Sequence, residues 1–199
     1  MKKQLLFIHG GTTFEKKEDY IKFLKTRPIR IEPKPHWNET YIDKKLENFQ
    51  IIKPRMPRRE KSEYEEWKIH FERHTEFIKD EVTLVGLSLG GIFLAKYLSE
   101  NEYPRKIRSV HLIALPFNNT LPEEELVGGF ELTSDLSLIE EQCKDVHLYF
   151  SKDDPIVPIE HANLYKEKLP NSKFHVFESK NGHFLTPEFP ELISMIKEA

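Results

Sequence analysis

The 199-residue chain lacks the features that mark secreted, membrane-spanning and nucleic-acid-binding proteins. Its single cysteine, Cys143, cannot form a disulfide within the chain, which fits a reducing compartment. The 30 basic and 33 acidic residues give a formal net charge of −3, so there is no basic excess to attract nucleic acid. No apolar run approaches the roughly 18 residues that a membrane span requires. We therefore expect a soluble, cytoplasmic protein with no membrane span and no nucleic-acid partner.

The first apolar run is also too short to be the hydrophobic part of a secretion signal. Residues 5–8 are apolar, but His9 and two glycines follow at once, and no small-residue cleavage site comes after them. A short apolar run that ends at glycines is instead typical of a buried strand.

Strand-like and helix-like patterns alternate along the whole chain, which has the length and composition of one domain. The strands are expected at residues 5–9, 49–52, 82–87, 110–115, 146–150 and 174–177. The helices are expected at residues 20–24, 64–78, 92–98, 136–139, 161–169 and 191–197. This alternation predicts an α/β fold over residues 1–199, with a mainly parallel sheet of about six strands and helices on both faces.

Two long segments lie outside these elements. Residues 29–48 are rich in proline, lysine and glutamate and are expected to form a surface connection. Residues 116–134 follow a predicted strand and are interpreted as a functional loop. Aromatic residues in the predicted loops either overhang the site or pack in the core, and the sequence leaves both open for Phe14, Trp37, Phe117 and Phe130.

Residues 86–90 read Gly-Leu-Ser-Leu-Gly, a G-x-S-x-G pattern between a predicted strand and a predicted helix. A serine at such a sharp turn projects its Oγ above the sheet, and the two glycines let chain segments pass closely. The next helix points its positive N-terminal end at the site, which favours an oxyanion. Ser88 is therefore the candidate nucleophile. The competing interpretation is a glycine-rich turn with an incidental serine.

Serine needs a base to act as a nucleophile, and after this kind of turn the partners follow in the order acid, then histidine. His183 lies behind a glycine after the last predicted strand and is the candidate base. Asp153 and Asp154 both follow the strand at residues 146–150. We choose Asp154 as the acid because Pro155 and the turn after it fix its direction. Asp153, which could cap that turn, remains the alternative.

An oxyanion hole requires two backbone N–H groups. One is expected from Leu89, the residue after the nucleophile, and the other from the loop after the first strand. In that loop Gly11 is the first choice and Thr12 the second, because glycines allow a substrate to come close to the backbone. His9 is expected to pack in the loop.

The other histidines and the cysteine receive structural interpretations. His70 and His74 are four residues apart on a predicted helix, but no third ligand is apparent, so no metal site is expected. Cys143, near a helix end, has no nucleophile-like turn around it. Histidines within or beside strands are expected to be structural, namely His111, His147 and His175; the two expected on the surface are His36 and His161.

These motifs resemble the α/β-hydrolase superfamily over nearly the whole chain. More narrowly, the chain is similar to the short serine-hydrolase family that includes retinoblastoma-binding protein nine. The narrower likeness rests on Trp67 and on the residues at 54–57, 129–132 and 151–155. It implies a compact hydrolase fold without a large cap domain, and Ser88, Asp154 and His183 as a catalytic triad.

The sequence therefore predicts a serine hydrolase that cleaves a carboxylic ester or related acyl bond through an acyl-enzyme, needing no metal or organic cofactor. Its partner would be a small-molecule or surface-presented acyl substrate. Two alternatives stay open: a thioesterase or acyltransferase with the same triad, and a weakly active binding or scaffold protein on the same fold. The natural substrate and the oligomeric state are left open.

Overall fold

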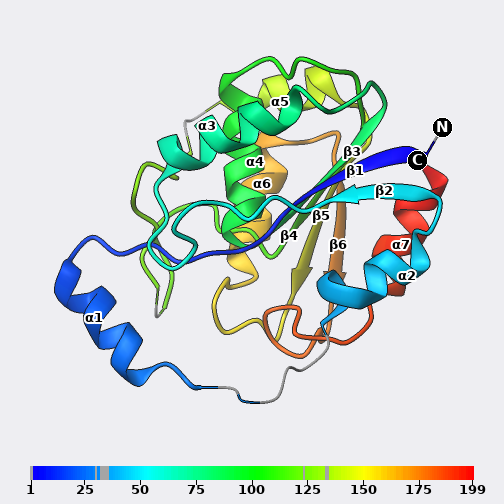
Figure 1. Ribbon diagram of the computed structural model, residues 1–199. Coiled ribbons are helices and arrows are strands. Elements are labelled where there is room, and N and C mark those ends of the chain that lie inside the picture. The colour runs from blue at the N-terminus through cyan, green and yellow to red at the C-terminus, as the bar shows by residue number, and fades with distance from the viewer. Residues whose placement is uncertain (1, 30, 32–35, 123, 133–134) are drawn as a thin grey trace.

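The computed structural model describes residues 2–29, 31, 36–122, 124–132 and 135–199 (Figure 1). Six parallel strands form one sheet in the order β2-β1-β3-β4-β5-β6. The strands are β1 (Lys3–Ile8), β2 (Phe49–Ile52), β3 (Val82–Leu87), β4 (Ile107–Ile113), β5 (Val146–Ser151) and β6 (Lys173–Phe177). The longer helices are α1 (Lys17–Thr26), α3 (Tyr64–Thr75), α4 (Leu89–Glu100), α6 (Glu160–Lys168) and α7 (Pro190–Glu198), and α5 (Ser137–Gln142) is short.

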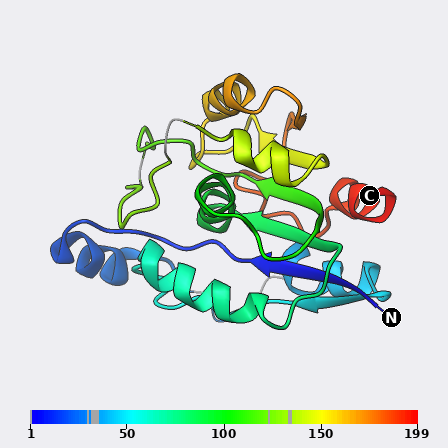
Figure 2. The same cartoon turned by 90° about the horizontal axis from the view of Figure 1, so that it is seen from above.

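Alternate residues of the central strands face two separate hydrophobic cores. Leu6, Ile8 and Leu84 belong to the larger core, which contains residues of α3, α4, α5 and α6. Leu5 and Val85 point the other way, into a smaller core with residues of α7. Figure 2 shows α4 and α7 on opposite faces of the sheet. Such two-sided burial explains why β1 and β3 read as nearly continuous apolar runs.

The order of the strands reverses between β1 and β3. The chain leaves β1 toward β2 at one edge of the sheet, then returns past β1 to β3 and continues to β4. The loops after β1 and β3 therefore separate, and a crevice opens at the carboxyl ends of these strands. The glycine loop after β1 and Ser88 after β3 both lie at this point.

The prediction of a plain surface connection over residues 29–48 is wrong. A π-helical turn, η1 (Trp37–Tyr41), leads into α2 (Ile42–Lys45). Trp37, Ile42 and Leu46 are almost fully buried in the smaller core. These three residues are four to five positions apart and form one apolar stripe. The proline-, lysine- and glutamate-rich composition of the segment made this stripe easy to overlook. Residues 30 and 32–35 of this segment lie outside the described residues.

Helix α1 lies apart from the sheet (Figure 1), and none of its residues is buried. The described parts of residues 116–134 form no long element, but Glu125 pairs with Thr13 in an isolated antiparallel bridge. Residues 123, 133 and 134 of this predicted loop lie outside the described part.

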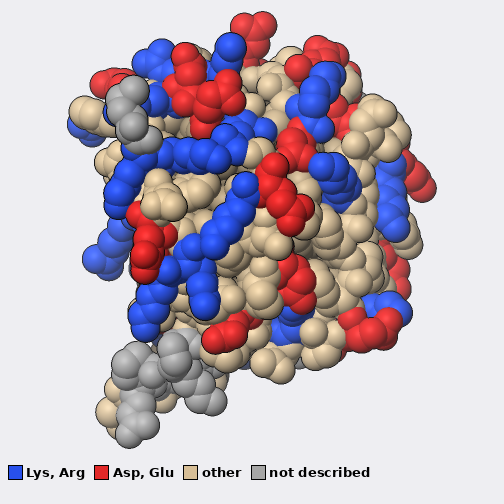
Figure 3. Space-filling model, turned by 90° about the vertical axis from the view of Figure 1, so that its right-hand side faces the viewer, with Lys and Arg blue, Asp and Glu red and all other residues tan. Residues whose placement is uncertain are grey.

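Within the described residues of the chain, no helix is both long enough and apolar enough to cross a membrane. The face that carries α2 and α7 displays both signs of charge (Figure 3).

Candidate active site

Ser88 occupies the sharp turn between β3 and α4 with a backbone conformation that few non-glycine residues adopt. Its φ is 55° and its ψ is −121°. Its amide donates to the carbonyl of Ile113 on the neighbouring strand at 2.8 Å, and its carbonyl accepts from the amides of Gly91 and Ile92. Such a conformation costs about 1–3 kcal/mol and persists where the surroundings fix it, as these bonds do here.

The two glycines around Ser88 are required by close backbone contacts. A Cβ on Gly86 would lie 2.5 Å from the carbonyl oxygen of Gly90, and a Cβ on Gly90 would lie 2.3 Å from that of Ile8. Gly10, in the loop after β1, faces the nucleophile, since its Cβ would lie 3.2 Å from that of Ser88. The glycines therefore let the β1 loop, the turn and α4 meet around one serine.

Asp154 lies just after β5, and hydrogen bonds hold its carboxylate. Oδ1 accepts the amides of Ile156 at 2.9 Å and Val157 at 3.1 Å, so the turn itself fixes the side chain. Oδ2 lies 2.7 Å from His183 Nδ1. Only 2% of the Asp154 side chain is exposed, and 13% of that of His183, so water screens this contact weakly. The predicted acid and the predicted base are therefore in contact.

His183 lies in a tight turn after β6. Asn181, Gly182 and Phe184 all have positive φ, and the amide of Phe184 donates to the carbonyl of Gly182 at 2.8 Å. A carboxylate only accepts hydrogen bonds, so His183 Nδ1 carries a hydrogen toward Asp154. The lone pair of a neutral ring is then on Nε2.

Ser88 and His183 line one cavity of about 400 Å³, which we call the Ser88 cavity. Its wall includes Gly10, Gly11 and Thr12 from the β1 loop. The structure thus brings the predicted nucleophile, base and oxyanion loop to the same space.

The oxyanion donors differ in how their amides are engaged. Leu89 is the first residue of α4, so its N–H has no partner within the helix. The Thr12 amide donates to the carbonyl of Arg59 at 3.0 Å, whereas no hydrogen bond of the Gly11 amide is found among the described residues. Gly11, Ser88 and Leu89 also border one small cavity. This geometry favours Gly11 over Thr12.

Asp153, the alternative acid, has a different set of partners. Its carboxylate accepts hydrogen bonds from the hydroxyls of Ser151 and Ser179 and from the amides of Lys180 and Gly182. The hydroxyl hydrogen bonds of Ser151 and Ser179, with the help of the two amides, lower the pKa of Asp153 well below its usual range. Asp153 thus fastens the turn that precedes His183 to the end of β5.

Two further residues shape the site: Trp37, which the sequence placed either over the site or in the core, and Arg59, which sequence reasoning missed. Trp37 donates from Nε1 to the carbonyl of Phe184 at 3.1 Å, and its amide donates to the carbonyl of Thr186, so η1 anchors the chain just after His183. Arg59 donates from Nε to the carbonyl of Gly10 at 3.0 Å and lines the Ser88 cavity. The apolar stripe behind Trp37 was a usable signal, whereas nothing in the local sequence marked Arg59.

The four loop aromatics pack against other side chains and do not border the site. Trp37 and Phe130 are fully buried in the cores. Phe117 packs edge-on against Tyr165, and Phe14 contacts Phe23 of α1. None of the four lines the Ser88 cavity.

The structure places three of the remaining histidines, one of them contrary to expectation. His161 is buried, contrary to its expected surface position, and the Phe117 amide donates to its Nδ1 at 3.0 Å. Its place on the inner side of α6, close beneath the loop after β4, buries it. His9 packs in its loop, where Nε2 accepts the amide of Met56 at 3.0 Å. His36 is half-buried at the wall of the Ser88 cavity.

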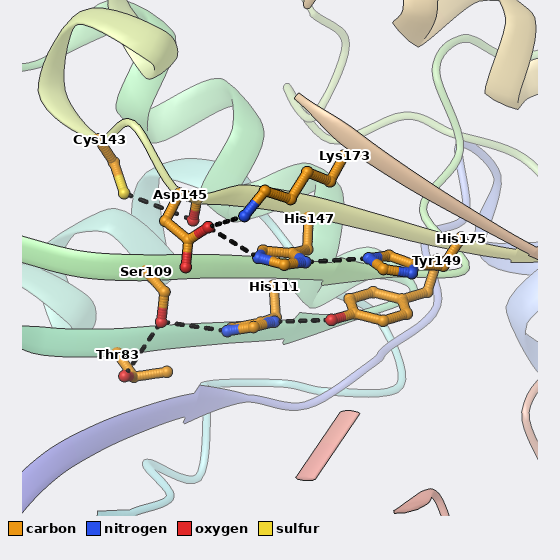
Figure 4. A network of polar contacts seen from close by, with 9 residues as sticks. All are labelled: Thr83, Ser109, His111, Cys143, Asp145, His147, Tyr149, Lys173 and His175. Atoms are coloured by element: carbon orange, nitrogen blue, oxygen red, sulfur yellow. Dashed lines mark hydrogen bonds and ion pairs between the residues drawn. The ribbon is translucent and has the colours of Figure 1, made fainter. Parts of the chain in front are cut away.

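Three histidines expected to be structural lie together on the sheet (Figure 4). His111 and His147 stack with their ring centroids 4.8 Å apart, and His147 Nδ1 lies 2.9 Å from His175 Nε2. Cys143 is buried beside them, and burial raises the pKa of its thiol to about 11, which leaves it unreactive. Within the described residues, no group of three or more His, Cys, Asp or Glu side chains is arranged to hold a metal ion.

A family model described as serine hydrolase matches residues 31–188. The fold is similar to that of the ydeN gene product of B. subtilis, with a TM-score of 0.77 and 20% identity, covering 98% of this chain and 97% of that one. A meta-cleavage product hydrolase of Pseudomonas fluorescens gives a TM-score of 0.66 at 12% identity, and the match covers 98% of this chain and 91% of that one. A lipase-esterase related protein of Clostridium acetobutylicum gives a TM-score of 0.57 at 16% identity, and the match covers 98% of this chain and 93% of that one. These likenesses confirm the predicted compact α/β-hydrolase fold.

Proposed function

The chain belongs to the serine hydrolase family, and on that premise we propose that it cleaves a carboxylic ester or related acyl bond with Ser88, Asp154 and His183 as its triad. One observation carries the proposal. The Asp154 carboxylate lies 2.7 Å from His183 Nδ1, and His183 lines the same cavity as Ser88, whose backbone is held in a strained turn. An incidental serine in a glycine-rich turn would not need an oriented histidine at the same cavity.

In the first step, Ser88 Oγ attacks the acyl carbon while His183 Nε2 takes its proton. Asp154 holds the ring in the required tautomer and stabilises the imidazolium that forms. The amides of Leu89 and Gly11 donate to the oxyanion of the tetrahedral intermediate. His183 then gives its proton to the leaving oxygen as the acyl–oxygen bond breaks, which leaves an acyl group on Ser88.

The second step returns the enzyme to its starting state. His183 removes a proton from water, the resulting hydroxide attacks the acyl carbon, and the bond to Ser88 Oγ breaks as His183 protonates that oxygen. The products are a carboxylic acid and an alcohol. All the groups used belong to the chain itself.

Labelling and turnover together test this proposal. We expect a fluorophosphonate probe to label the wild-type protein and short p-nitrophenyl esters to be cleaved. Ser88→Ala should abolish the labelling and lower kcat/KM by about 10⁴-fold or more. Labelling that persists in Ser88→Ala would refute the nucleophile. A folded wild-type protein that neither labels nor turns over would favour the binding or scaffold alternative.

The same triad would serve a thioesterase or an acyltransferase, which differ only in leaving group and acceptor. Comparing p-nitrophenyl butyrate with a butyryl thioester, each with and without an added alcohol, distinguishes the three activities. A higher kcat/KM for the thioester, or alcohol capture of most of the acyl group, would replace the esterase assignment while leaving the triad intact.

We also propose that the enzyme works in the cytoplasm on a small-molecule or surface-presented acyl substrate. A lone, buried thiol at Cys143 fits a reducing compartment. Fractionation of cells that produce the tagged protein tests the location, and recovery mainly outside the cytoplasm would refute it.

A further inference from the structure

The Ser88 cavity has a larger neighbour. A groove of about 920 Å³, which we call the adjoining groove, runs along the segment after β2. Arg59, Asn38, Glu39 and Glu60 line both spaces, so the two meet along a shared wall. A substrate with its acyl carbon at Ser88 would extend past Arg59 into the groove.

The adjoining groove is lined by five basic side chains and two acidic ones, namely Lys53, Arg55, Arg58, Arg59 and Lys61 against Glu39 and Glu60. Some of these charges are already paired. Lys53 lies 2.5 Å from Asp43, Arg58 lies 2.7 Å from Glu66, and Glu60 pairs with Arg27.

The described residues place no carboxylate within ion-pair distance of Arg55, Arg59 or Lys61. Set against the remaining acid, Glu39, these three cations leave the groove with a positive excess. An anion entering it would gain charge-assisted hydrogen bonds without first breaking an ion pair.

Arg59 is oriented for such a contact. Its Nε donates to the carbonyl of Gly10 at 3.0 Å, and its own carbonyl accepts the amide of Thr12 at 3.0 Å, so the residue is held against the oxyanion loop. The Nε bond leaves the two terminal amino groups of the guanidinium to bind a carboxylate or phosphate.

The second arginine, Arg55, lines the same groove as Arg59 and His9. Burial lowers the pKa of His9, a hydrogen bond with the Gly10 carbonyl opposes this, and the positive charges of Arg59 and Arg55 add to the lowering. Both arginines therefore contribute positive charge to the groove wall beside His9.

We propose that the substrate of Ser88 carries a carboxylate or phosphate group, which binds in the adjoining groove to Arg59 and Arg55 while its acyl carbon lies at Ser88. This inference rests on the proposed hydrolase function. The Ser88 cavity itself is lined by Arg27 and Arg59 against Glu39, Glu60 and Glu124, so the excess of basic side chains lies in the adjoining groove, beyond the acyl group.

Matched esters test the proposal. Mono-p-nitrophenyl glutarate and p-nitrophenyl valerate have acyl chains of equal length, one ending in a carboxylate and the other in a methyl group. The suberate and octanoate esters form a longer pair. We expect kcat/KM to be higher for the charged member of at least one pair. Arg59→Gln should lower that charged-to-neutral ratio by about tenfold and Arg55→Gln by less, because ionic hydrogen bonds are involved.

The ratio separates recognition from structural damage, because loss of the Arg59–Gly10 bond would slow both esters alike. Arg73→Gln removes the same charge from α3, where the side chain lines neither space, and should leave the ratio unchanged. Added salt should lower the wild-type ratio.

Three results would overturn the proposal: a ratio at or below one in both wild-type pairs, a ratio unaffected by either groove variant, or an equal fall in Arg73→Gln. If Ser88 is labelled and neutral esters are cleaved, such a result refutes only the anionic substrate. If neither happens, the hydrolase proposal itself fails.

Competition assigns the anion. Inorganic phosphate and acetate are each added to the hydrolysis of the charged ester. Stronger inhibition by phosphate assigns a phosphate-bearing substrate, and stronger inhibition by acetate assigns a carboxylate. In either case the inhibition should weaken in Arg59→Gln, and inhibition that is unchanged in that variant would contradict the proposal.

Discussion

Strand β5 has a carboxylate–histidine contact at each end, and the two differ in what the histidine faces. After the strand, Asp154 lies 2.7 Å from His183, whose ring borders the Ser88 cavity. Before the strand, Asp145 lies 3.0 Å from His147, whose other ring nitrogen lies 2.9 Å from His175. The first histidine has a nitrogen available to a reacting serine, whereas the second uses both nitrogens within the fold.

The contact between Asp145 and His147 belongs to a network of polar contacts on the sheet (Figure 4). Lys173 lies 2.6 Å from the same carboxylate oxygen as His147. Because a carboxylate only accepts, His147 Nε2 donates to Asp145, and His147 Nδ1 accepts from His175 Nε2. A hydrogen bond between carboxylate and imidazole is therefore insufficient for catalysis. The geometry of a triad also needs access to a nucleophile in a cavity.

Replacing each carboxylate gives the sharpest test of this comparison. We expect Asp154→Asn to lower kcat for ester hydrolysis by about 10³–10⁴-fold, since an amide no longer selects the required tautomer of His183. Asp145→Asn should leave kcat within about threefold and lower the free energy of unfolding by about 1–2 kcal/mol. Steady-state kinetics and urea denaturation measure the two effects. An inactive but folded Asp145→Asn protein would contradict the view that only the Asp154–His183 contact serves catalysis.

A smaller effect is expected at Asp153, which holds the turn before His183 without touching its ring. Asp153→Asn removes one acceptor for the turn formed by residues 179–182. We expect kcat to fall about 10–100-fold with little change in KM, because a displaced base slows the chemical step more than binding.

Asp145→Asn is the matched control for Asp153→Asn, because it removes the same charge at the other end of β5. Full activity in Asp153→Asn would show that the turn positions His183 without this residue. A loss as large as that of Asp154→Asn would instead support Asp153 as the acid.

The smallest effect concerns stability in mild acid. Burial lowers the pKa of His111 well below its usual value, and burial also lowers the pKa of His147 and His175. These rings stay neutral in the fold, whereas in the unfolded chain they gain protons below about pH 6.5. The unfolded chain then binds more protons, so stability should fall as pH drops from about 6.5 toward the lowered pKa values.

We expect the free energy of unfolding to fall by at most about 1.4 kcal/mol per pH unit for each fully neutral ring. His111→Gln should be less stable at pH 7 but show a shallower decline between pH 7 and pH 5, measured by urea denaturation. Tyr149 and Ser109, which face His111, and Asp145 and Lys173, which face His147, are unchanged in this variant. An identical slope in both proteins would exclude His111 as a contributor.

Features that depend on local pattern were predictable from the sequence alone. The bounds of β3 were predicted correctly, because a short apolar run that ends in a glycine-serine turn has a clear local signature. The succession of Ser88, an aspartate and His183 after successive strands was readable for the same reason. Parallel strands end at one edge of the sheet, so the order of elements alone places these residues together.

Contacts between segments that are distant in the sequence could not be predicted in this way. Asp153 and Asp154 are adjacent, yet one contacts the ring of His183 and the other the turn before it, across 29 residues of sequence. Trp37 reaches the carbonyl of Phe184 across 147 residues, and Arg59 reaches that of Gly10 across 49. A side chain's partner in such contacts depends on how distant segments pack, which no local periodicity encodes.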